Sequence, residues 1–460
     1  MKRLIFILTY ILTLTMLWAQ NTITGTLTGL PDQSIKLMGF QGFDTYAIDS
    51  TRTNANGAFT LSFAEKDEGM GILLSENKKS FVIVLAGNEH LKLTGKDLSN
   101  PDAIRFINGP ENKLFERYAK EHARREQTLN AWEFMKRIYT TDSLFAVHQA
   151  PKQAIENEMK RIQSEDSLFL EHLPEHSYVR FYLPLRKLIS AVPQIVRQHP
   201  EKIPATVEAF RNIDYTDHRL YKSGLLQMAI ESQFWMLQNS RQSPPVIYKE
   251  MEISIDRLLD NLQADEEKLK EITEFLFKLL EKNSLVKASE YLALRLLNEN
   301  ACSLDDDFAS QLESYRAMQV GHIAPDIVFS GDMLVPEYKA NNVPKKLSEL
   351  KSRYKVLIFG AGWCPHCQDA FKEIVKLYPK WHQKGIEIVF ISLDDDKKTF
   401  DDFTKNFPFI SVCDYRKWQN QAVKDYHVFA TPTIYMLDAN NKILLKPNDV
   451  NQLNDWIKSK

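Results

Sequence analysis

Cysteine is scarce in this chain, with four residues in 460. A fold held together by a framework of disulfides is therefore excluded. The scarcity directs attention to the chemistry of the few cysteines that are present.

An excess of charge of either sign is also missing. The chain has 58 Lys and Arg against 60 Asp and Glu, a net charge of -2, which offers no electrostatic basis for binding nucleic acid or an anionic membrane. Low-complexity tracts and clear internal repeats are absent from the sequence. With 44% hydrophobic and 26% charged residues over 460 positions, the chain exceeds what one hydrophobic core supports, so several domains are expected.

A long apolar run occurs only near the amino terminus, at residues 4–18, after Lys2 and Arg3. It is shorter than a bilayer requires and is typical of a signal peptide covering residues 1–19, with cleavage after Ala19. No cysteine follows the cleavage region, so a lipoprotein anchor is not indicated. An uncleaved anchor is the alternative. In both cases we expect the folded part outside the cytoplasm, where disulfides persist.

The most informative segment present is Trp363-Cys364-Pro365-His366-Cys367. It follows a short apolar run rich in β-formers at residues 355–359 and the turn 360–362. A helix is expected next, because Phe371, Ile374, Val375 and Tyr378 share one helical face, and Pro379 predicts that this helix ends or kinks there. The cysteines are thus predicted at a strand-to-helix junction.

A second proline-containing segment, Thr431-Pro432-Thr433, precedes another apolar run at 434–437. The turn 438–441 and the run 442–446 then complete a predicted hairpin. The predicted order is strand, CxxC, helix, strand, and a hairpin that begins at a proline.

Position and charge predict the chemistry of the CxxC segment. A thiolate at a helix amino terminus is stabilised by unpaired backbone N–H groups and the helix dipole, so Cys364 is the expected nucleophile. Cys367, one turn along, would resolve the mixed disulfide. Pro365 suits the first helical turn, and His366 can place a cation near the thiolate, which favours the reduced form.

These motifs resemble the TlpA/ResA-like thioredoxins over roughly residues 321–460, from Ala324-Pro325-Asp326 through KVLIFGAGWCPHC and GIEIVFISLD to ATPTIYMLD. The resemblance implies an α/β thioredoxin fold and a periplasmic location. It also implies a cis Pro432 lying against the cysteines, with Trp363 and Thr431 tuning the centre or contacting substrate. Protein thiols and disulfides of the cell envelope are the implied substrates, with a membrane or periplasmic redox partner and neither cofactor nor metal. Peroxiredoxins, another family with this fold, carry Thr or Ser where this chain has Ala361, so a resemblance to them is disfavoured.

The chain departs from the family pattern in two places, with Ile358 where a buried Asp or Asn is usual and Ala370 where many relatives carry Glu. The carboxylate that manages the proton of the buried cysteine is therefore missing. Asp369 or Glu373 could substitute, although their spacing is more typical of solvent-facing charges. The CPHC tetrad resembles that of the oxidase DsbA, yet the spacing leaves no room for the helical insertion of DsbA.

The other two cysteines, Cys302 and Cys413, are isolated from each other in sequence. A zinc site at Cys364 and Cys367 would need a second pair of ligands, so it is disfavoured. Both isolated residues are expected to be buried free thiols.

The region before the thioredoxin-like domain divides into two predicted parts. Residues 21–108 show a β pattern and predict a β-sandwich, with Asn56-Gly57 as the strongest hairpin signal. This part resembles an uncharacterised domain that precedes thioredoxin modules in bacterial envelope proteins. Residues 110–320 are predicted to be helical, with Pro244-Pro245 separating two helices and an amphipathic core stripe at 272–280. The expected strands are 22–27, 35–38, 46–51, 58–63, 71–74, 81–85 and 91–94.

The sequence therefore predicts an extracytoplasmic thiol-disulfide oxidoreductase with three domains, at 21–108, 110–320 and 321–460. One alternative is an envelope binding or assembly module whose thioredoxin domain has weak redox activity. Another is a protein whose disulfide state controls partner affinity.

Overall fold

The computed structural model of the chain describes residues 21–460, apart from 88, 300–305 and 337–342. The predicted signal peptide and Cys302 lie outside the described residues. The chain divides into two compact units between Ser243 and Pro244. Helix α7 starts at Pro244 and the preceding helix ends at Gln238, so two helices are separated here as predicted, with both prolines in the first turn of the second one. The three-domain division at 21–108, 110–320 and 321–460 remains a proposal.

The first unit begins with two four-stranded sheets, in the orders β4-β1-β7-β8 and β3-β2-β5-β6. Alternate residues of both sheets, among them Ile23, Leu37, Leu61 and Leu73, fill one shared core, which confirms the β-sandwich. Each predicted strand is present, and β8 was missed because it is short and buries only Phe106. The strands are β1 Asn21–Leu27, β2 Ser34–Gln41, β3 Asp44–Arg52, β4 Ala58–Phe63, β5 Gly69–Ser75, β6 Ser80–Leu85, β7 His90–Gly95 and β8 Arg105–Asn108.

The hairpin expected at Asn56-Gly57 is not formed, although the turn is. Strands β3 and β4 belong to different sheets, since β3 pairs with β2 and β4 pairs with β1. Gly57 has a φ of +77°, and a Cβ on it would stand 2.0 Å from the carbonyl oxygen of Leu27. The turn thus connects one sheet of the sandwich to the other. Its backbone conformation and close approach to Leu27 require glycine at position 57.

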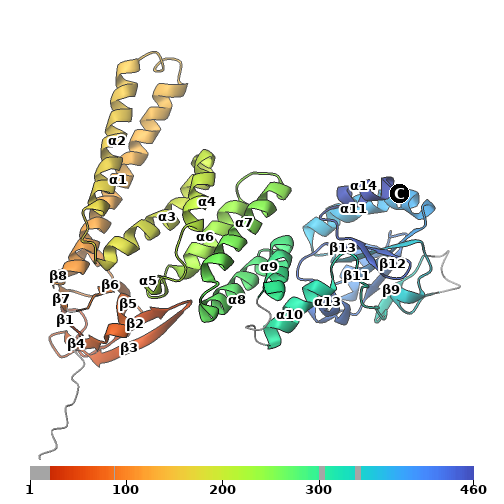
Figure 1. The fold of residues 1–460 in the computed structure, drawn as a ribbon, viewed down its shortest axis with the longest axis horizontal. Helices are drawn as coiled ribbons and strands as arrows, with labels where there is room; N and C mark the ends of the chain where they lie inside the picture. Colours follow the sequence, from red (N-terminus) through yellow and green to blue (C-terminus); the bar gives the residue numbers. More distant parts are fainter. Residues whose placement is uncertain (1–20, 88, 300–305, 337–342) are drawn as a thin grey trace, which may run out of the picture. The chain divides into compact units, whose positions relative to one another are not determined.

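Helices form the rest of the first unit. Helices α1 and α2 make a long antiparallel hairpin (Figure 1). The buried carboxylate of Asp166 in α2 accepts from His122 of α1 at 2.9 Å and from Lys187 of α3 at 2.5 Å. The helices are α1 Pro110–Thr141, α2 Gln149–Glu171, α3 Tyr178–Gln198, α4 Ile203–Arg211, α5 His218–Tyr221 and α6 Leu226–Gln238.

This charged cluster predicts an acid-dependent stability. Burial opposes ionisation of Asp166, but the hydrogen bonds from His122 and Lys187 outweigh it and hold its pKa well below the usual range. A depressed folded-state pKa contributes stability above the unfolded pKa of about 4, and this contribution is lost as the pH falls through the folded value. We expect Asp166→Asn to cost about 1–3 kcal/mol at pH 7 and less near pH 3, where the carboxyl of the unfolded chain is largely protonated, as measured by urea unfolding. The exposed Glu175→Gln is the control, and an equal cost of Asp166→Asn at both pH values would refute this role.

The second unit opens with four helices. On α8, Ile272, Leu276 and Leu280 are buried, so the predicted stripe is core. Phe277, which was not part of the predicted stripe, is also fully buried, whereas Phe275, which was, is only partly buried. The buried face of α8 is therefore rotated slightly from the predicted one. The helices are α7 Pro244–Leu262, α8 Glu266–Lys282, α9 Val286–Glu299 and α10 Asp306–Ala317.

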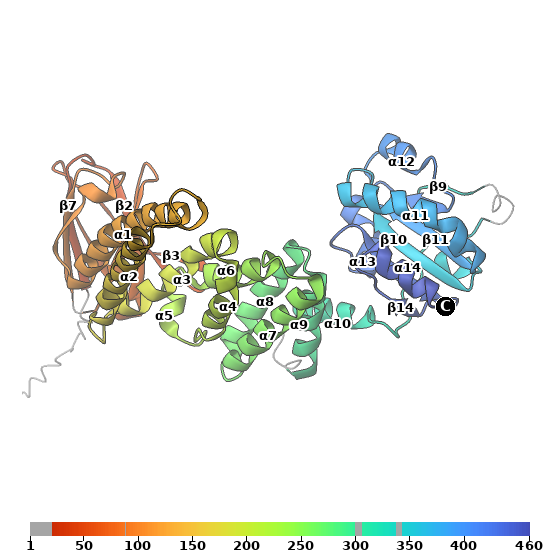
Figure 2. The ribbon, with the colours of Figure 1, turned by 90° about the horizontal axis from the view of Figure 1, so that it is seen from above.

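A six-stranded sheet of order β14-β13-β10-β11-β12-β9 follows. Strands β10, β11 and β12 are parallel neighbours, while β13 runs antiparallel to β10. Helices α11 and α14 cover one face and α13 lies over the other (Figure 2), so the central strands are buried on both sides and read as continuous apolar runs. The elements are β9 Asp332–Leu334, β10 Tyr354–Gly360, α11 Pro365–Gln383, β11 Ile386–Ser392, α12 Lys397–Thr404, β12 Ile410–Cys413, α13 Gln421–Asp425, β13 Thr433–Asp438, β14 Ile443–Leu445 and α14 Val450–Lys458.

Of the two outcomes predicted at Pro379, an end or a kink of the helix, the end does not occur, because α11 continues through this residue. Two neighbouring side chains of α11 are buried on either side of Pro379. Tyr378 is 3% exposed and Trp381 is 2% exposed. The indole N–H of Trp381 also donates to Asn454 of α14 at 3.1 Å. This packing outweighs the single backbone hydrogen bond that a proline removes.

In the described part of the chain, no helix combines the length and the apolar character needed to cross a membrane.

Candidate functional site

The two cysteines of the CxxC segment lie where β10 passes into α11, as the pattern predicts. Cys364 is the N-cap of α11, and its Sγ accepts a hydrogen bond from the backbone N–H of Cys367 at 3.3 Å. Cys364 is 5% exposed and Cys367 is 0% exposed. The first sulfur is thus the more accessible of the pair, and it lies at the positive end of the helix dipole.

The loop that contains Thr431 and Pro432 lies against the sulfur of Cys364. The Thr431–Pro432 peptide bond is cis, and the Cys364 thiol donates to the carbonyl oxygen of Thr431 at 3.5 Å. This contact joins residues 67 positions apart. The structure therefore brings together Cys364, Cys367, Thr431 and Pro432.

The two thiols differ in their tendency to ionise. Burial, followed by the hydrogen bond with Cys364, raises the pKa of Cys367 to about 12. Cys367 therefore holds its proton at neutral pH in the dithiol form. Cys364, the more exposed of the two thiols, is therefore the candidate for the attacking thiolate.

The residues between and before the cysteines face solvent. Pro365 is the first helical residue, and it and His366 are exposed. Trp363 is 45% exposed and donates its indole N–H to the carbonyl oxygen of Leu393 at 3.3 Å. These side chains form the surface around Cys364.

Sequence reasoning missed Asp394, a fully buried carboxylate under the same loop. It accepts from the backbone N–H of Gly362 at 2.9 Å and from the hydroxyl of Ser392 at 2.7 Å. Burial raises the pKa of Asp394. Asp394 is a positioning residue for the loop that carries Trp363 and Cys364. A carboxylate directly after a buried strand was the available signal.

The departures from the family pattern are visible in space. Ile358 is fully buried in β10, and Ala370 packs against the core, so neither position offers a carboxylate. Asp369 pairs with Lys372 at 3.0 Å with its side chain 78% exposed, and Glu373 is exposed. The solvent-facing interpretation of both carboxylates is confirmed.

Cys413 is a buried free thiol, as predicted, with its Sγ donating to the carbonyl oxygen of Asp394 at 3.5 Å. Burial raises the pKa of Cys413 to about 11. Among the described residues, no cluster of three or more His, Cys, Asp or Glu side chains is placed to hold a metal ion.

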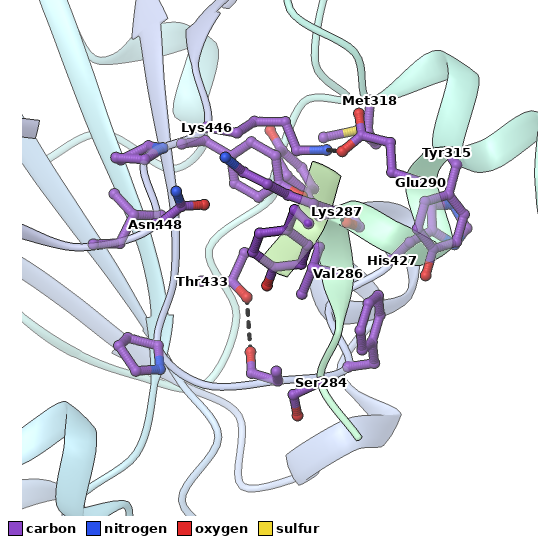
Figure 3. A pocket seen from close by; sticks show the side chains of 18 residues that line it. Ser284, Val286, Lys287, Glu290, Tyr315, Met318, His427, Thr433, Lys446 and Asn448 are labelled. Atoms are coloured by element: carbon purple, nitrogen blue, oxygen red, sulfur yellow. Dashed lines mark hydrogen bonds and ion pairs between the residues drawn. The ribbon is translucent and has the colours of Figure 1, made fainter. Parts of the chain in front are cut away.

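A cavity of about 230 Å³ borders the same loop. Residues of the loop, among them Pro432 and Thr433, line one side, and residues of α9 and α10 line the other (Figure 3). The sequence offered no signal for it, because its walls come from segments more than 100 residues apart.

Parts of the chain are similar to known proteins. Residues 352–443 match the model of a family described as thioredoxin-like. The chain is 32% identical over 126 residues to the thiol-disulfide oxidoreductase ResA of Oceanobacillus iheyensis, covering 27% of this chain and 62% of that protein. It is 28% identical over 138 residues to ResA of Geobacillus thermodenitrificans, covering 30% and 73%. A crystal structure of a thioredoxin-like protein from Bacteroides caccae aligns with a TM-score of 0.38 and 16% identity, covering 58% of this chain and 96% of that one.

The carboxyl-terminal region of this chain is therefore a thioredoxin-like domain, related to enzymes named thiol-disulfide oxidoreductases. The predicted resemblance and the predicted α/β fold of this region are confirmed. The match spans somewhat less than two thirds of the Oceanobacillus relative, at 62% of its length.

Proposed function

We propose that this protein is an extracytoplasmic thiol-disulfide oxidoreductase that exchanges the Cys364/Cys367 pair with protein substrates. The observation that carries the proposal is the placement of Cys364 Sγ. It lies at the N-cap of α11, 3.3 Å from the N–H of Cys367 and 3.5 Å from the carbonyl of Thr431. A thiol held in this way lies at the positive end of the helix dipole and faces the loop that a substrate chain would approach.

The exchange balances without a cofactor. The Cys364 thiolate attacks one sulfur of a substrate disulfide, the substrate S–S bond breaks, and the departing sulfur takes a proton. Cys367 loses its proton and attacks Cys364 Sγ, which releases the second substrate thiol and leaves the Cys364–Cys367 disulfide. Two electrons pass to the substrate, and a dithiol of a redox partner returns them. With the direction reversed, the same steps oxidise a substrate dithiol.

The cellular setting belongs to the proposal. The apolar segment at residues 4–18 supports export, and a periplasmic location would supply protein thiols and disulfides of the envelope as substrates. A membrane or periplasmic redox partner would complete the cycle.

The proposal is tested by equilibrating the protein with glutathione mixtures and measuring the fraction of the Cys364–Cys367 disulfide by mass spectrometry. We expect a single two-electron transition. A potential near about -120 to -180 mV would indicate an oxidase or isomerase, and one below about -250 mV a reductase. Failure of the pair to form an intramolecular disulfide at any ratio would refute the proposal.

The same titration tests the role of His366. An imidazolium two residues from Cys364 would stabilise the thiolate and hence the reduced form, so we expect His366→Ala to make the potential more negative. A shift of about 30 mV corresponds to about 1.4 kcal/mol. The control is His382→Ala, because His382 is exposed at the opposite end of the same helix. An unchanged potential in His366→Ala would remove His366 as a tuning residue.

A further inference from the structure

The cavity beside the cis-proline loop has the position and charge of a substrate subsite. We propose that it binds an acidic side chain of the substrate polypeptide close to the reactive cysteine, with Lys287 as the residue that determines this preference. The inference rests on the proposed function, and it adds a substrate class that the thiol chemistry alone does not specify.

The cavity lies close enough to Cys364 for a substrate bound there to reach it. Thr431 contacts Cys364 Sγ through its carbonyl oxygen, and the next two residues, Pro432 and Thr433, line the cavity. Two residues of extended chain span roughly 7 Å. A substrate cysteine joined to Cys364 would therefore bring the side chain of a nearby residue to this opening.

The wall opposite the loop is held in place by aromatic packing. The ring of Tyr315 in α10 stands 6.0 Å from that of Phe429 and 6.2 Å from that of His427, measured between centroids. The Tyr315 hydroxyl donates to Glu281 of α8 at 2.6 Å. Residues before the thioredoxin-like domain thus contribute a preorganised side of the cavity, which reduces the entropy lost on binding.

The charges lining the cavity leave one cation in excess. Lys446 is paired with Glu290 of α9, with Nζ 3.0 Å from Oε2, and both side chains are about one-fifth exposed (Figure 3). Lys287, one turn earlier on α9, has its Nζ 5.6 Å from the centre of the Tyr248 ring. No carboxylate among the described residues lies within ion-pair distance of it. Burial lowers the pKa of His427, so this ring adds no cation at neutral pH.

An acidic side chain fits this arrangement better than a basic or a purely apolar one. A carboxylate entering the cavity would pair with the ammonium group of Lys287 and contact the surrounding aromatic rings with its methylene groups. A lysine or arginine would meet an excess positive charge in a partly desolvated site, where like-charge repulsion is stronger than in water.

The test uses the full chain and short disulfide-linked peptides. The two residues before and the two after the peptide cysteine are varied one at a time between Glu, Gln and Lys, and kcat/KM is measured for each peptide. At one or more of these positions we expect Glu to be preferred over Lys by about tenfold, equivalent to about 1.4 kcal/mol.

The exposed position of Lys287 makes its substitution compatible with folding. We expect Lys287→Gln to abolish the preference and Lys287→Glu to reverse it. The control is Lys282→Glu, because Lys282 is an exposed lysine of the preceding helix that does not line the cavity. Equal rates with Glu and Lys peptides, or a preference unchanged by Lys287→Glu, would overturn the inference. Absence of turnover with every peptide would instead overturn the proposed function.

Discussion

Replacing Cys364 by serine is expected to abolish thiol-disulfide exchange, with the rate falling about a thousandfold or more, to that of the uncatalysed reaction. Cys364 is the sulfur at the N-cap of α11, and Cys367, 0% exposed with a pKa of about 12, cannot take over its role. A serine hydroxyl neither ionises at neutral pH nor forms a disulfide. A thousandfold loss corresponds to about 4 kcal/mol in the activation barrier.

The measurement is reduction of a disulfide-linked peptide by the full chain in the presence of excess dithiol, with Cys413→Ala as the control. Cys413 is equally a cysteine of the thioredoxin-like domain, but it is buried in β12. We expect this control to retain the rate of the unsubstituted protein. Wild-type turnover by the Cys364→Ser protein would contradict the assignment of the nucleophile.

Replacing Cys367 by serine has the second largest expected effect, which is accumulation of a covalent complex with substrate. Cys364 remains able to attack, because its N-cap position depends on the backbone N–H of residue 367 and not on that side chain. The resolving thiol is gone, so the mixed disulfide persists. Serine is slightly smaller than cysteine and fits the site, where a Cβ added to Gly360 would stand 3.2 Å from the Cys367 sulfur.

The complex is detected as a mass increase equal to one substrate chain, stable to denaturation and released by a reducing agent. The double variant Cys364→Ser, Cys367→Ser should give no adduct, which tests that the bond is made by Cys364. If Cys367→Ser releases product at the wild-type rate without an adduct, the two-cysteine mechanism is wrong.

Local patterns were sufficient where one segment determines its own structure. Strand β10, the CxxC junction and the β13–β14 hairpin were predicted because apolar runs, turn residues and helical spacing lie next to one another in the chain. The resemblance to ResA-like proteins added the partner loop at Pro432. The same locality explains the confirmed turn at Asn56-Gly57.

Local patterns failed where distant packing decides. The Asn56-Gly57 turn connects two sheets instead of two paired strands, because β1 and not β3 is the partner of β4. Pro379 stays inside α11 because Tyr378 and Trp381 are anchored in the core on that face. Asp394 was overlooked because its hydrogen bond to Gly362 spans 32 residues.

The sequence by itself predicted the chemistry, since two thiols one helical turn apart after a buried strand indicate a redox pair. Only the tertiary structure decided what surrounds it. It buried Cys367 more deeply than Cys364 and brought the Thr431 carbonyl to the Cys364 thiol. It also set Lys287 of α9 in the wall of the same cavity as Pro432. The physical reason is that residue types and their local spacing are present in one segment, whereas burial, hydrogen bonding across the fold and cavity walls arise from side chains far apart in the chain.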